Sequence, residues 1–523
     1  MMSRGVLPEP RNAQPYLRCF ALALIGWAAL PQFRLAAREV EITILHTANV
    51  RGHVLSMRYR ERAAYSGGLL RCMTMVRAIR EEQKHVFLID CGGLLYGSPE
   101  SALTGGSLPL EAAGRMGVDA RVAAASDLSR GAAHAARLEA RSRIPVLAAN
   151  CAPRTPGYSL FLNCRPYTLW DCDGVRVAMV GLGSWAQDED ALFQVTPPEE
   201  ALREVLHTIR SCRAQVTVLA LHVRDTPANG RPNPLLDLAR KFPDFDVILG
   251  GAGATPLRGA AVGTVLVARA APGARSLGRV NLVYDTEQDA LVRTSADMIE
   301  IGPEVPEDAE LTSELGAALG RARHQLEQVV GYTDRDIGGT SRWPGQSGIQ
   351  ALVCQSVQER MSVEIVLWGA AGQGSLARGP ILYRDICRAV PEDYRLAVVH
   401  LTAAQLREVL EANAVRFGEA GFLGIHGAHY RFDRGGEGGE QITELRLADG
   451  EKPHGRRRLV VACSAGMLQP GEGNPAMIRL AAHPEARLTV HEIDTREYVI
   501  DYIRRHSPLD VKAVRGGVLN PTL

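Results

Sequence analysis

The sequence predicts two large α/β domains joined by a helical connection. At 523 residues the chain is longer than one hydrophobic core usually serves. Up to about residue 285, short apolar strands that end in Gly-containing turns alternate with amphipathic helical segments, which is typical of layered α/β domains. A helical pattern at residues 306–330 then precedes a second series of the same kind.

The first strand is predicted at residues 42–45, where a β-branched apolar run stops at the polar turn 46–53. Ligands of α/β sheets bind at the carboxyl ends of strands, so chemistry is expected at this turn. An amphipathic helix is predicted at residues 67–82 and another at 108–116. Further strands are expected at residues 86–89, 118–125, 146–150, 216–222 and 246–249, with a hairpin at 174–183 and a hairpin-like region at 262–284.

Residues 306–330 form an uninterrupted helical pattern, with Pro306 near its start and Gly331 just past its end. We therefore predict a first domain over residues 38–302, a linker helix over 303–330 and a second domain over 331–523. Within the second domain, helices are predicted at residues 349–361 and 403–414.

Residues 1–37 carry three arginines ahead of the apolar run Cys19–Leu30, followed by small residues. This order is typical of a secretory signal peptide, and the run is too short to span a bilayer comfortably. We expect a periplasmic or secreted protein, with an uncleaved N-terminal anchor as the alternative. Since no other stretch approaches membrane-spanning length, no further membrane contact is expected.

The charge balance gives no sign of a nucleic-acid partner, because 59 basic residues face 58 acidic ones. The run Arg456–Arg458 beside a predicted strand is interpreted as a solvated face. Ten cysteines include four in apolar stretches, interpreted as small core residues: Cys91, Cys354, Cys387 and Cys463. Three others lie in loop-like sequence and are candidates for a disulfide bridge: Cys151, Cys164 and Cys172.

The turn after the first strand, His46-Thr47-Ala48-Asn49-Val50-Arg51-Gly52, resembles the opening L-H-T-N-D-x-H-G motif of the 5'-nucleotidase family. The resemblance places Asn49 and Arg51 where the family has an Asp and a His that bind metal. The family's second motif, D-x-G-D, resembles Asp90–Gly93, with Gly93 at the position of the Asp that bridges both metals.

Three further motifs follow in the family's order. The G-N-H-E/D-F-D turn is similar to residues 124–129, with Ala125 and Ser126 at its Asn and His. The S-H strand end keeps its histidine as His222. The G-G-H-S-H-T turn is similar to residues 250–255, with Ala252 and Ala254 in place of both histidines.

The resemblance implies a calcineurin-like metallophosphoesterase domain, a four-layer sandwich, followed by the family's α/β C-terminal domain. That second domain binds the nucleoside in the family. Here Gln373 stands near the position of a ligand-binding Arg, and Glu392 at that of a stacking Phe. Both nucleoside-binding positions have thus lost the family's residue.

Two-metal hydrolysis needs anionic and imidazole ligands that hold two cations about 3.5–4 Å apart. Of the seven ligand positions that the resemblance implies, only His222 keeps a ligating side chain, and Arg51 adds a fixed positive charge. We therefore expect no bound cofactor. A divalent metal remains the alternative, including a relocated single-metal site of His53, Asp127 and His222. The resemblance also implies that His46 and Asp90 are framework residues that hydrogen-bond the turns rather than metal ligands.

The leading hypothesis is a catalytically inactive, exported relative of 5'-nucleotidases that binds an unknown small anion or protein. Arg51 and His222, with the free backbone N–H groups of the glycine turns, would form an anion site. Alternatively, Arg51 fills the vacated cavity by pairing with Asp90 or Asp127. Two other hypotheses are a hydrolase of phosphate esters or nucleotides with rearranged ligands, serving nucleotide catabolism, and a purely structural or protein-binding role.

Overall fold

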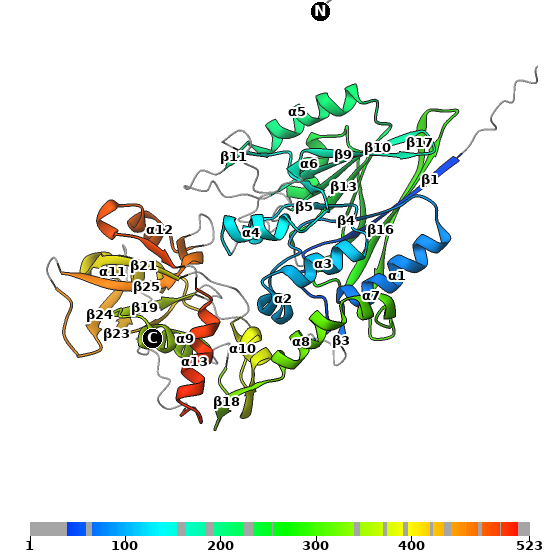
Figure 1. Cartoon of the computed structure of the whole chain (residues 1–523). Helices are drawn as coiled ribbons and strands as arrows, with labels where there is room; N and C mark the ends of the chain where they lie inside the picture. Colours follow the sequence, from blue (N-terminus) through cyan, green and yellow to red (C-terminus); the bar gives the residue numbers. More distant parts are fainter. Residues whose placement is uncertain are drawn as a thin grey trace, which may run out of the picture.

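A computed structural model describes most of the chain. The described residues are 39–58, 65–128, 130–153, 164–183, 193–222, 234–253, 255–338, 346–369, 374–390, 396–418, 422–433, 441–454, 457–468, 473–491 and 493–510. The proposed signal segment lies outside them. The described residues form two domains, which Figure 1 shows side by side.

The first domain is built on two sheets. The first sheet has the strand order β17-β16-β1-β4-β5-β6-β8, and β1 pairs parallel with β4 and antiparallel with β16. Its strands are β1 (Glu39–Thr47), β4 (Val86–Asp90), β5 (Ala120–Val122), β6 (Val146–Leu147), β8 (Cys164–Arg165), β16 (Ser276–Asp285) and β17 (Ala290–Glu300).

The second sheet has the order β14-β15-β13-β12-β10-β9, in which the central strands run parallel. Its strands are β9 (Tyr167–Cys172), β10 (Val175–Leu182), β12 (Val216–Leu221), β13 (Val247–Gly250), β14 (Leu257–Val262) and β15 (Val265–Arg269). A short pair, β7 (Cys151–Pro153) and β11 (Phe193–Val195), lies apart from both sheets.

Apolar cores on both sides of each sheet explain the layering. Ile42 and Ile44 of β1 pack with Val177 and Val218 in the core between the sheets. The outer face of the first sheet is covered by α1 (Leu69–Glu82) and α3 (Ser107–Arg115), and that of the second by α5 (Pro198–Ser211) and α6 (Pro234–Lys241). The predicted four-layer α/β/β/α sandwich is thus confirmed. Parallel strands with two covered faces also account for their nearly continuous apolar sequences.

Most predicted elements of this domain are present, but the prediction of a hairpin-like region at residues 262–284 is wrong. β15 and β16 lie in different sheets, and the chain crosses from one to the other between Arg269 and Ser276. The antiparallel partners are instead β14 with β15 and β16 with β17. Both segments have strand-like composition, and periodicity alone does not specify the sheet that each joins.

The predicted uninterrupted helix at residues 306–330 is also wrong. The structure has α7 (Ala309–Glu314) and α8 (Gly316–Leu326), and the strand β18 (Val329–Thr333) begins before residue 330. Asp308 caps α7 by accepting a hydrogen bond from the Leu311 N–H. Leu315, buried at the break, is followed by Gly316, a residue of low helix propensity.

The second domain is built around the sheet β22-β19-β25-β21-β26. One face packs against α9 (Gly348–Arg360) and α13 (Thr495–Arg505), the other against α11 (Ala403–Ala414) and α12 (Pro475–Ala481). The sheet strands are β19 (Ile365–Trp368), β21 (Leu396–Thr402), β22 (Gly424–His426), β25 (Arg458–Ser464) and β26 (Thr489–His491). Outside this sheet, β20 (Gly379–Leu382) pairs with β18. The strands β23 (Ala428–Phe432) and β24 (Ile442–Leu447) form a separate hairpin.

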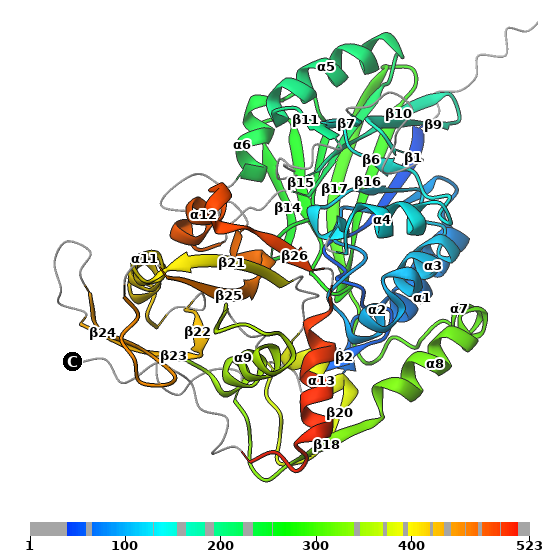
Figure 2. The same ribbon diagram turned by 60° about the vertical axis from the view of Figure 1, so that its left-hand side comes forward.

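Helices of both domains meet at the interface. Helix α10 (Tyr383–Ala389) of the second domain packs against α2 (Pro99–Thr104) of the first and against α8. Figure 2 shows α13 running beside this junction. An ion pair also crosses it, with 3.6 Å between Arg130 Nη2 and Asp494 Oδ2.

Candidate functional site

The five motif turns follow the carboxyl ends of strands in the first domain. Asn49 and Arg51 follow β1, Gly93 follows β4, and His222 and Ala252 follow β12 and β13. Ala125 and Ser126 are exposed in η1 (Ala125–Leu128), just after β5. Ala254 lies outside the described residues. Because these strands are neighbours within the two packed sheets, their turns share one edge of the sandwich.

The first two turns are hydrogen-bonded directly to each other. The N–H groups of Asn49 and Arg51 donate to the carbonyls of Gly92 and Gly93 at 2.9 and 2.7 Å, and the Gly52 N–H donates to Leu94 O at 2.7 Å. Asn49 and Arg51 adopt left-handed conformations, with φ of 49° and 55°. Three of the backbone N–H groups expected for an anion site, those of Asn49, Arg51 and Gly52, are therefore already used.

His222 lies against these turns. Its Nδ1 donates to Cys91 O at 3.2 Å. Burial lowers the pKa of His222, although Asp127 and the Cys91 hydrogen bond oppose the shift. The imidazole is therefore neutral at pH 7, and its Nε2 carries the lone pair.

The described residues at these turns do not supply the ligand set of a metal pair. A Cβ at Gly93 would lie 2.8 Å from Asn49 Oδ1 and 3.0 Å from His222 Cε1, so a side chain at this position would have to shift at least one of these two groups. A Cβ at Gly251 would lie 1.7 Å from Cys91 O, so those turns also touch through their backbones. No three His, Cys, Asp or Glu side chains of the described residues lie together as a metal site.

The relocated single-metal site is wrong, because its three residues do not gather. His53 is buried, and its pKa is lowered to about 3 by burial and by the charges of Arg51 and of Arg388 on α10. Asp127 instead accepts a hydrogen bond from Arg121 Nη1 at 3.0 Å.

Asp90 stabilises the conformation of the second motif turn through hydrogen bonds. Its Oδ2 accepts from Thr47 Oγ1 at 2.8 Å, and its Oδ1 accepts from the Gly92 N–H at 3.0 Å. Burial raises the pKa of Asp90 to about 6 against these hydrogen bonds. The interpretation of Asp90 as a framework residue is confirmed.

His46 is a core residue of β1, although we expected it to hydrogen-bond the turns. It faces Gly278 of β16, where a Cβ would lie 2.1 Å from His46 Nε2. Its Nδ1 is buried without a hydrogen-bond partner among the described residues, and burial lowers its pKa to about 4. A neutral ring packed on glycine has no role at the turns.

A buried ion cluster beside the site was not foreseen from the sequence. Arg121 on β5 is fully buried and pairs with Asp127 of η1 and with Glu139 of α4 (Ala132–Glu139). Asp90 also interacts with the charge of Arg121. An arginine inside an otherwise apolar strand was the available signal, since a buried charge requires partners.

Arg51 does not fill a buried cavity, because its side chain is exposed and its Cβ and Nε border Gly97. The carboxylates of Asp90 and Asp127, its two suggested partners, are bound by the groups already described. Arg51 therefore lies at the surface of the domain, and His222 lies among the turns.

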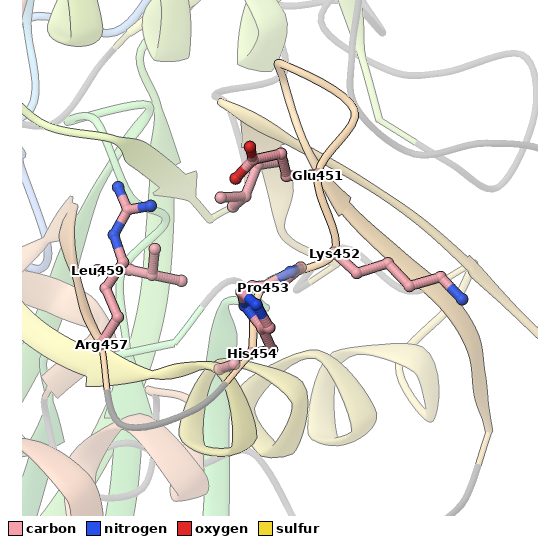
Figure 3. Close-up of a pocket in the computed structure, with 8 residues that line it drawn as sticks. Glu451, Lys452, Pro453, His454, Arg457 and Leu459 are labelled. Carbon is pink, nitrogen blue, oxygen red and sulfur yellow. The ribbon is translucent and has the colours of Figure 1, made fainter.

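The nucleoside positions Gln373 and Glu392 lie outside the described residues. Elsewhere in the second domain, a surface pocket of about 70 Å³ lies beside β25 (Figure 3). Its lining includes Glu451, His454 and Arg457, and Arg457 pairs with Glu364. Arg458 pairs with Glu485, so these two residues of the predicted basic run form a solvated, ion-paired face.

Comparison with known proteins agrees with this architecture. Residues 329–477 match the family model "5'-nucleotidase, C-terminal domain". Protein UshA of Yersinia enterocolitica is 22% identical over 93% of this chain and 94% of its own. The trifunctional nucleotide phosphoesterase protein YfkN of Bacillus subtilis is 23% identical over 79% of this chain, which spans only 30% of that relative.

Among solved structures, the 5'-nucleotidase precursor from Thermus thermophilus superposes with a TM-score of 0.69 at 18% identity, over 92% of this chain and 99% of that one. Fold and turns together define a metallophosphoesterase-type domain followed by a 5'-nucleotidase C-terminal domain. The chain is thus similar to 5'-nucleotidases over most of its length, and residues 329–477 match the family's C-terminal domain. No helix among the described residues is long and apolar enough to cross a membrane.

Proposed function

We propose that this chain is a catalytically inactive, exported member of the 5'-nucleotidase family, which acts by binding rather than by hydrolysis. The observation that carries the proposal is Gly93, which puts no carboxylate where Asn49 Oδ1 and His222 Cε1 border the position of its missing side chain. Without a bridging carboxylate, two cations would repel each other strongly. Export rests on the basic and apolar segments of residues 1–37.

The exposure of Arg51 supports a small anion as the ligand, because a guanidinium binds oxyanions through its planar fork. Since the N–H groups of Asn49, Arg51 and Gly52 bond to the second turn, such an anion would be held mainly by side chains. A protein partner is the other candidate. Stabilisation by phosphate or sulfate that Arg51→Gln abolishes would support the anion, and its absence would favour the protein.

The first test is the metal content of the purified protein after incubation with Mn, Zn and Mg followed by dialysis. We expect no stoichiometric metal, and no hydrolysis of AMP or of a generic phosphate ester. Two metals per chain would overturn the proposal and establish a hydrolase with rearranged ligands. His222→Ala is the control, because trace activity that survives it comes from a contaminating phosphatase. N-terminal sequencing of the mature protein tests export separately.

A further inference from the structure

Two thiols of the first domain lie on the same small apolar cluster. Cys151 and Cys164 both pack against the buried side chains of Ala123, Val146 and Ala148. Both are half-buried and both are free thiols in the structure. They stand on either side of the segment 152–163.

Backbone pairing holds the two residues near each other. Cys164 is opposite Val146 in the parallel pair β6–β8. The next residue, Arg165, accepts a hydrogen bond from the Ala148 N–H at 3.0 Å, while the Cys151 N–H donates to Ala148 O at 3.3 Å. Ala148 thus links both cysteines to the end of the same strand.

Other cysteines nearby are engaged differently. Cys172 is fully buried in the core between the two sheets. Cys212 lies after α5, where its Sγ is 3.5 Å from the hydroxyl of Tyr167. Of the three cysteines that the sequence offered for a bridge, the structure therefore groups only Cys151 and Cys164.

We propose that Cys151 and Cys164 form an intrachain disulfide bond. The two thiols lose two protons and two electrons as one S–S bond forms. A disulfide oxidant accepts them and becomes two thiols: glutathione disulfide in vitro, or an oxidised thiol oxidoreductase in an exporting cell. The bridge does not depend on the catalytic status of the chain.

The bond would lie close to the ion cluster. Arg121 and Glu139 both act on the charge of the Cys164 thiol, and burial is the main reason that its pKa rises to about 11. Burial and the neighbouring Cys164 raise the pKa of Cys151 to about 12. Because thiolates are scarce at neutral pH, oxidation should be slow and should accelerate at pH 9.

The test is peptide mapping of the full-length protein after oxidation with glutathione disulfide. Residual thiols are alkylated in denaturant, and trypsin with chymotrypsin then separates the cysteines at Arg154, Tyr167 and Trp170. We expect a linked pair of peptides containing Cys151 and Cys164. Alkylation of both residues after oxidation, or their linkage to other cysteines, would overturn the proposal.

Thermal unfolding gives a second readout. Oxidised wild-type protein should melt several degrees above the reduced protein, because the bridge restricts the unfolded chain. Cys151→Ser should abolish this difference, whereas Cys212→Ser, a matched half-buried thiol, should retain it. An equal response of both variants to reductant would contradict the assignment. If Cys151→Ser does not fold, the wild-type peptide map decides.

Discussion

At the scale of single residues, Gly93 stands at the position where the resemblance implies a carboxylate that bridges two metals. Its φ is 73°, and its missing Cβ leaves room for Asn49 and His222. If position 93 had open space around it, one substitution could supply a carboxylate there. Because Asn49 and His222 lie close to this position, an introduced side chain must also displace at least one of them.

Gly93→Asp should therefore destabilise the protein by about 1–3 kcal/mol through overpacking, without creating a metal site. Urea denaturation with and without Mn²⁺ measures both effects. Gly263→Asp is the matched control, since Gly263 has a φ of 61° but open space around its Cβ, so it reports the backbone cost alone. Equal stability of the two variants, or stabilisation of Gly93→Asp by Mn²⁺, would show that the space exists.

At the scale of elements, Arg121 connects a strand, a 3₁₀ turn and a helix. β5 supplies the guanidinium, η1 supplies Asp127 and α4 supplies Glu139. Oδ1 of Asp127 is buried without a hydrogen-bond partner among the described residues. The cluster thus fixes the third motif turn through Oδ2 of Asp127, which accepts from Arg121 Nη1 at 3.0 Å and from the Ala124 N–H at 3.1 Å.

Arg121→Met should cost about 3–5 kcal/mol, because two buried carboxylates would lose their cation. The free energy of unfolding in urea measures this cost. Arg258→Met is the control: Arg258 pairs with Glu300, but both side chains are exposed, so its loss should stay below about 1 kcal/mol. Similar values for the two variants would mean that the buried cluster contributes little.

Helices could be predicted where the signal lies within the segment itself. The helices expected at residues 67–82 and 403–414 match α1 and α11 closely, since each has apolar spacing and clear ends. The pairing partners of β15 and β16 could not be predicted, because the sheet that each strand joins depends on packing with residues distant in the sequence. Glu139, eighteen residues from Arg121, could not be identified as its partner for the same reason.

For the candidate site, the sequence predicts which positions lack the family's ligands, and this stays a prediction. It did not predict that the turns bond to each other, because hydrogen bonds such as Asn49 N–H to Gly92 O depend on the three-dimensional placement of two strands. The expected contribution of free backbone N–H groups to an anion site therefore fails at Asn49, Arg51 and Gly52.

At the scale of the whole molecule, the domain junction includes a partly buried carboxylate. Asp494 caps α13, pairs with Arg496 at 3.0 Å and faces Arg130 across the interface. Burial raises its pKa to about 6, although the hydrogen bond from the Arg496 N–H and the charge of Arg130 oppose the shift. Its pKa in the folded state thus exceeds the unfolded value of about 3.9.

Asp494 therefore contributes stability that is complete below about pH 4 and is lost as the pH rises to about 6. Asp494→Asn keeps a good helix cap and should gain stability relative to wild type over this range, by up to about 3 kcal/mol. Urea denaturation at several pH values measures the difference. A constant difference from pH 4 to 7 would contradict the prediction.

Asp308→Asn should behave in the opposite way. Asp308 also caps a helix, but its hydrogen bond with Arg77 lowers its pKa. Its contribution is present above the unfolded pKa and disappears as the pH falls through the folded value. We expect the stability difference between variant and wild type to change with pH in opposite directions for Asp494→Asn and Asp308→Asn. This result would show that burial shifts the pKa of Asp494 and that pairing with a cation shifts the pKa of Asp308.

The direct hydrogen bonds between the first two turns have a consequence for where this protein can persist. In a metalloenzyme, the loops around the centre depend partly on an ion drawn from the surroundings, so folding is linked to metal supply. Here Asn49 and Arg51 bond to Gly92 and Gly93 with groups that the chain carries itself. If the proposed function holds, the fold would therefore assemble without a supply of zinc or manganese.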